Sequence, residues 1–203
     1  MDRGLALAAL AAIPALAALF YGLAQGGMRP LTACLVGLCA YWLLLLAALF
    51  WRRDWSLHLR WPGWRAALPL TALTASAAIF GGPAIPQLSP HVLVTVLIAA
   101  CINGTLEEAF WRGALVPRAN WQAALPAVGL FTLWHLAPAA AMAALDAKGG
   151  APGLLIAAAL LGICAMATRL ASGSAGFAAL CHVAINICTF AVLAATNGSA
   201  RFP

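Results

Sequence analysis

Long apolar runs separated by short polar breaks make up almost the whole chain. Each run approaches the roughly 20 residues that a helix needs to cross a bilayer, and the breaks contain the glycines, prolines and charges that end helices. The pattern predicts an all-α fold, a polytopic transmembrane helix bundle of about seven spans (six to eight). The predicted spans are residues 4–24, 31–51, 66–82, 91–116, 122–144, 152–170 and 175–196.

The composition agrees with a membrane protein and limits its partners. Hydrophobic residues make up 65% of the chain and charged residues 8%, whereas a soluble domain has about 25% charged residues. The net charge of +6 does not indicate nucleic-acid binding, because the arginines are scattered or flank apolar runs. The lipid bilayer is therefore the expected partner. No break is long enough for a soluble domain, so residues 1–203 are expected to form one integral membrane domain.

The basic residues predict how the bundle is oriented. The run at 4–24 is too long for a typical signal-peptide core, so we expect a retained first helix. With the N-terminus inside, seven arginines lie on the inner side and three basic residues on the outer side, which satisfies the positive-inside rule. Residues 52–65 combine arginines with tryptophans and predict an interfacial segment. The alanine-rich, arginine-over-lysine composition indicates a high-GC bacterium and a multi-pass protein of its inner membrane.

The cysteines and two of the histidines show no pattern of metal or disulfide chemistry. The six cysteines lie inside apolar runs and form no CxxC pair, so neither a disulfide framework nor a cysteine-based metal site is expected. His58 and His91 fall at interface or loop positions and are expected to be structural.

The strongest functional signal is the pair Glu107 and Glu108, the only glutamates of the chain, inside an apolar run. A charge at that depth costs about 2.5–3.5 kcal/mol even on lenient insertion scales, so such residues are functional by default. His135, His182 and Asn186 lie on two later runs. A rise of about 1.5 Å per residue brings all of them to the middle layer of the membrane.

Helical spacing predicts how these groups face one another. Glu108 and Arg112 are four residues apart, so they share a helix face and form an ion pair. Glu107 lies about 100° round the helix, lacks that partner and is the expected general base. His182 and Asn186 also share a face, and their N–H groups suit a developing oxyanion. The sequence also offers His135 as a third polar group, for water or substrate.

These residues form three spaced motifs that resemble those of the CPBP family of intramembrane glutamic endopeptidases, which includes CAAX prenyl protease-like and Abi proteins. The resemblance covers about residues 95–190, within a catalytic half of about 91–196, and Gly113 fits the family pattern. The motifs, in order, are Glu107-Glu108-x-x-x-Arg112, Phe131-x-x-x-His135 and His182-x-x-x-Asn186.

The resemblance implies a peptidase that uses water as the nucleophile and needs no metal or other cofactor. Glu107 would activate the water, His135 would position or polarise it, and His182 with Asn186 would stabilise the oxyanion. Glu108 would be oriented by the motif arginine. The implied substrate is a membrane-anchored protein or peptide. In a bacterium this is expected to be a sorting signal or peptide precursor rather than a prenylated protein.

Two other functions remain compatible with the residues. Glu and His side chains can bind zinc, which would make the chain a zinc-dependent intramembrane protease, although the HExxH spacing is missing. Intramembrane Glu and His also serve transporters and proton relays, and a non-enzymatic membrane role in transport or immunity is the third hypothesis. The sequence makes no prediction of the oligomeric state.

Overall fold

The computed structural model describes residues 1–53 and 55–198, and every regular element within these ranges is a helix. The prediction of an all-α bundle is confirmed. The long helices are α1 (Arg3–Gln25), α2 (Pro30–Trp51), α3 (Trp64–Gly81), α4 (Pro90–Glu108), α7 (Gly150–Ser172) and α8 (Gly176–Gly198). The shorter helices are η1 (Gly82–Gln87), η2 (Ala109–Ala114), α5 (Trp121–Trp134), α6 (Leu136–Ala139) and η3 (Met142–Ala144).

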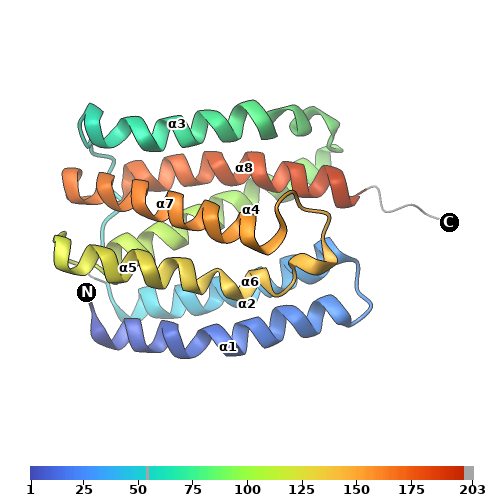
Figure 1. Cartoon of the computed structure of the whole chain (residues 1–203), viewed down its shortest axis with the longest axis horizontal. Coiled ribbons are helices and arrows are strands. Elements are labelled where there is room, and N and C mark those ends of the chain that lie inside the picture. The colour runs from blue at the N-terminus through green and yellow to red at the C-terminus, as the bar shows by residue number, and fades with distance from the viewer. Residues whose placement is uncertain (54, 199–203) are drawn as a thin grey trace.

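The helices run back and forth along the long axis of the molecule (Figure 1). Among the described residues, six helices are long and apolar enough to cross a membrane, counting α3 with η1 and α4 with η2. The chain is therefore a multi-pass membrane protein. The N-terminus, the connection from α2 to α3 and the turns before α5 and α8 gather at one end of the bundle (Figure 1). These are the arginine-bearing segments assigned to the inner side above.

The fifth predicted span, residues 122–144, is not one continuous helix. Helix α5 ends at Trp134, and α6 and η3 follow as short separate pieces. Pro138 accounts for the break, since its ring lacks an amide hydrogen and collides with the carbonyl four residues earlier, on Trp134. The break leaves His135 at the end of α5, with its backbone N–H bonded to Thr132 O at 3.1 Å.

Close contact between α4 and α8 brings their polar residues together. Gly104 permits this contact, because a Cβ atom at that position would lie 2.8 Å from the backbone nitrogen of Val183. Val183 follows His182 directly, and Gly104 precedes Glu107 by one helical turn. A larger residue at 104 would therefore push the two helices apart beside the predicted site.

The described residues of the interfacial segment between α2 and α3 form no helix or strand and are held against the start of α8. Ala175 N donates to Ser56 O at 3.4 Å, and the Ser174 hydroxyl donates to the carbonyl of His58. The Trp61 ring meets Phe177 edge-on, with centroids 5.5 Å apart. The segment thus covers the arginine-bearing end of the bundle beside the helix that carries His182.

Candidate active site

The helix that carries the two glutamates widens immediately after them. Residues Ala109–Ala114 form a π-helix, in which Leu115 N donates to Phe110 O, five residues back, at 2.8 Å. Single π turns inside α-helices are frequent at functional sites. All six residues of this wide turn are buried. The turn carries Arg112 into the interior of the bundle.

Glu108 is fully buried, with a relative exposure of 0%, and is bound by two cationic or donor groups. Arg112 Nη1 lies 3.1 Å from its Oε1, as the spacing predicted. The same oxygen lies 2.9 Å from His182 Nδ1 of α8. The contact with His182 was not predicted, because it depends on how α8 packs against α4.

Arg112 also connects the glutamate helix to two further helices. Its Nη2 donates to Gly162 O of α7 at 3.3 Å. Its guanidinium carbon lies 4.2 Å from the centre of the Phe131 ring on α5, a cation–π contact. The second predicted motif begins at Phe131, so this arginine touches the first two motifs at once.

Glu107 has two oxygens in different surroundings. Oε1 accepts from Asn103 Nδ2 at 2.9 Å and from the hydroxyl of Tyr41. Oε2 is buried without a hydrogen-bond partner. It lies 3.9 Å from His135 Nε2 and 3.8 Å from His182 Nε2. In the part of the chain that the structure describes, Glu107 has no arginine or lysine partner of its own, in keeping with its expected difference from Glu108.

The orientation of His135 follows from the end of α5. Its Nδ1 lies 2.8 Å from the carbonyl oxygen of Phe131. A carbonyl oxygen can only accept a hydrogen bond, so Nδ1 carries the hydrogen. The other ring nitrogen, Nε2, faces Glu107. The ring also packs edge-on against Phe131, with centroids 4.6 Å apart.

Asn186 lies on α8 one turn beyond His182, and both are buried. Its side-chain nitrogen is without a hydrogen-bond partner. Five of the six predicted residues therefore lie in one cluster whose neighbouring charged or polar atoms are 2.9–3.9 Å apart, and Asn186 adjoins them on the His182 face of α8. Among the described residues, no group of three or more His, Cys, Asp or Glu side chains is arranged to hold a metal ion.

Three polar side chains at this centre were missed by the sequence analysis: Tyr41, Trp42 and Asn103. Asn103 could have been found, because it is polar, lies in an apolar run and precedes Glu107 by four residues. Tyr41 and Trp42 gave no such signal, since aromatic residues in a membrane span usually just pack. Trp42 Nε1 donates to Asn103 Oδ1 at 2.8 Å.

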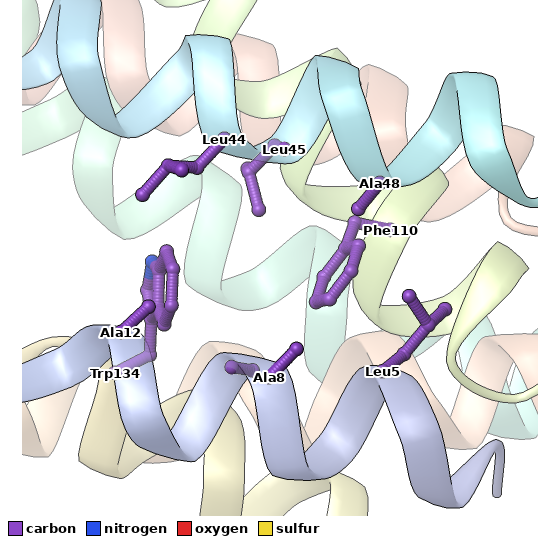
Figure 2. A pocket seen from close by; sticks show the side chains of 9 residues that line it. Leu5, Ala8, Ala12, Leu44, Leu45, Ala48, Phe110 and Trp134 are labelled. Atoms are coloured by element: carbon purple, nitrogen blue, oxygen red, sulfur yellow. The ribbon is translucent and has the colours of Figure 1, made fainter.

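A small apolar cavity of about 100 Å³ lies between α1 and α2, next to the polar centre. Figure 2 shows Phe110 and Trp134 facing this cavity beside Leu44 and Leu45. Trp134 also packs against Tyr41, with ring centroids 5.2 Å apart. No charged side chain lines this cavity.

The fold and this buried polar centre define a multi-pass helical membrane protein with a carboxylate–histidine cluster inside the bundle. The sequence model of the type II CAAX prenyl endopeptidase Rce1-like family matches residues 89–188, which include all six predicted site residues. The match covers just under half of the chain, confirms the resemblance over this segment, and supports a membrane protease of the CAAX-endopeptidase type. Comparisons with curated proteins and with solved structures gave no match.

Proposed function

We propose that the protein hydrolyses a peptide bond in a membrane-associated protein or peptide, and that Glu107 activates the attacking water. The observation that carries this proposal is the position of Glu107 Oε2. It is buried, free of hydrogen bonds and faces two imidazole nitrogens at 3.8 and 3.9 Å. These separations are too long for direct hydrogen bonds but suit a bridging water.

The reaction then follows the ordinary course of glutamate-assisted hydrolysis. A water between Oε2 and the two histidines gives a proton to Oε2 as its oxygen attacks the carbonyl carbon of the peptide. The carbonyl π bond breaks and its electron pair becomes an oxyanion. The oxyanion electron pair then re-forms the C=O bond, the C–N bond breaks, and the leaving amine takes the proton from Glu107. His135, fixed through its Nδ1–H bond to Phe131 O, positions the water.

The oxyanion is stabilised from α8. The Asn186 amide nitrogen has no hydrogen-bond partner and two hydrogens to donate. His182 Nδ1 bonds to Glu108, so its Nε2 donates to the oxyanion when the ring carries a second proton. The carboxylate of Glu108 compensates the positive charge that the His182 ring then carries. Hydrogen-bond donors of this kind stabilise an oxyanion most strongly in a site that excludes water.

Glu108 and Arg112 act as positioning residues in this proposal. Both are almost fully buried and form an ion pair with each other, and Glu108 also holds the His182 ring. The catalytic half at 91–196 operates within one membrane domain, in the inner membrane of a bacterium. The substrate is a membrane-anchored protein or peptide of that cell rather than a prenylated protein.

The proposal is tested by comparing cells that express the parent protein with cells that express Glu107→Gln. New C-termini in the membrane fraction are identified by mass spectrometry, which names substrate and cleavage site together. Asp146→Asn is the matched control, because Asp146 lies in the exposed outer loop and, within residues 1–53 and 55–198, forms hydrogen bonds only through its backbone. Cleavage products should disappear with Glu107→Gln and persist in the control. Products that persist with Glu107→Gln would remove Glu107 from the mechanism.

A further inference from the structure

Helix α2 supplies a side chain to the base although it lies outside the matched family segment. Tyr41 is buried, with a relative exposure of 1%, and its hydroxyl donates to Glu107 Oε1. A tyrosine placed in a membrane span needs a partner for its hydroxyl. Here that partner is one oxygen of the carboxylate proposed to activate water.

Asn103 donates to the same oxygen, and its orientation is fixed from α2 as well. The indole N–H of Trp42 can only donate, so it must meet the amide oxygen of Asn103, at 2.8 Å. The amide nitrogen of Asn103 is thereby turned toward Glu107 Oε1, at 2.9 Å. Two adjacent residues of α2 thus control both hydrogen bonds of one carboxylate oxygen.

The consequence concerns which oxygen of Glu107 can take a proton. A carboxylate oxygen with two donated hydrogen bonds has both lone-pair directions in use. A proton on Oε1 would point at one of the two donors and break its bond. Oε2 has no such donor and faces the two histidines.

We propose that Tyr41 and Asn103 are positioning residues that occupy Oε1 of Glu107 and so direct proton transfer from the attacking water to Oε2. This inference rests on the proposed role of Glu107 as the base. Without the two donors the carboxylate turns, the proton is shared between both oxygens, and Oε2 no longer holds the water against His135 and His182.

A tyrosine that merely ties α2 to α4 would contribute to stability, and the test must separate the two roles. Tyr41→Phe removes the hydroxyl and keeps the ring that packs on Trp134. Tyr21→Phe is the matched control, because Tyr21 is the only other tyrosine and is 59% exposed on α1. Asn103→Ala removes the second donor.

The kinetic probe is a quenched fluorescent peptide that covers the cleavage site mapped by mass spectrometry. We expect Tyr41→Phe and Asn103→Ala each to lower kcat by about 10–100-fold while KM changes by less than about twofold, the pattern of lost positioning. Tyr21→Phe should leave both constants at the parent values. A kcat within twofold of the parent for Tyr41→Phe, or a rise in KM alone, would overturn the inference.

A second measurement does not depend on turnover. In the Tyr21→Phe background Tyr41 is the only tyrosine, so growth with 3-fluorotyrosine labels that one site. Its ¹⁹F resonance should move when Glu107→Gln replaces the charged acceptor by a neutral one, and should stay in place with Asp146→Asn. A resonance that does not respond to Glu107→Gln shows that the hydroxyl is not bonded to the carboxylate and overturns the inference.

The two proposals fail in different ways. If Glu107→Gln is inactive and Tyr41→Phe is as active as the parent, the base assignment holds and the positioning role is wrong. If Glu107→Gln retains full turnover, the assignment of the base is wrong, and the role of Tyr41 in proton transfer falls with it.

Discussion

His182 Nδ1 lies 2.9 Å from Glu108 Oε1, while His182 Nε2 lies 3.8 Å from Glu107 Oε2. One imidazole therefore spans both carboxylates of the adjacent glutamate pair. Glu108 is expected from its arginine partner to be structural, yet it also holds the ring proposed to face the substrate. The two glutamates are linked through α8 as well as through their own helix.

This relationship predicts that Arg112→Ala is costly for stability. The substitution leaves Glu108 buried at 0% exposure without its cation and removes the contacts to Gly162 and Phe131. Breaking a buried pair on one side typically costs about 3–5 kcal/mol. We expect a clearly lower midpoint for thermal unfolding in detergent, together with loss of activity.

The control for this prediction is Arg118→Ala, which removes an exposed arginine six residues further along the chain. It should unfold at the parent temperature. Equal unfolding temperatures for the two variants would show that the Arg112 contacts contribute no net stability.

Asn186→Ala tests the oxyanion site. It removes a buried, unpartnered amide from the face of α8 that also carries His182. Loss of one oxyanion donor usually lowers kcat by about 10²–10³-fold. Thr189→Ala, an exposed change on the same helix, is the control and should leave kcat unchanged. A fully active Asn186→Ala protein would exclude this residue from the mechanism.

Chelation separates the glutamate mechanism from the zinc alternative. His135, His182 and Glu107 lie close together. The proposed mechanism requires them only to bind a water molecule and to accept its proton. We therefore expect turnover of the purified protein to survive EDTA and then 1,10-phenanthroline. Activity that is abolished by these chelators and restored by added Zn²⁺ would establish the metal-dependent mechanism instead.

Gly104→Ala tests the close contact of α4 with α8. The added methyl would lie 2.8 Å from Val183 N, so the helices must separate beside His182. Overpacking of this kind costs about 1–3 kcal/mol, and the shift should also lower kcat. Gly129→Ala in α5 is the control, because its methyl meets nothing within 4 Å. Identical stability and rates for both variants would mean that the contact relaxes without consequence.

The contacts made within one helix could be predicted from the sequence. Residues four apart lie on one face, which is enough to predict the Glu108–Arg112 pair and the shared face of His182 and Asn186. The apolar runs likewise predicted the long helices. Pro138 could have predicted the break after Trp134, but the length of the apolar run alone does not show it.

Contacts between helices could not be predicted in the same way. Which carboxylate meets His182 depends on the register of α4 against α8, which the glycine at 104 permits but does not specify. Tyr41 reaches Glu107 across 66 residues of sequence. Nothing in the spacing of the second span distinguishes this tyrosine from one that only fills space.

The hydrogen bonds from Tyr41 and Trp42 have a consequence for modularity. The family match begins at residue 89, whereas both side chains belong to α2 (Pro30–Trp51). A chimaera that grafts residues 89–188 onto the first helices of another protein therefore keeps every motif residue and still loses the environment of Glu107 Oε1. For such a chimaera to be active, its first helices must supply an aromatic hydroxyl and an indole at the same depth as Tyr41 and Trp42.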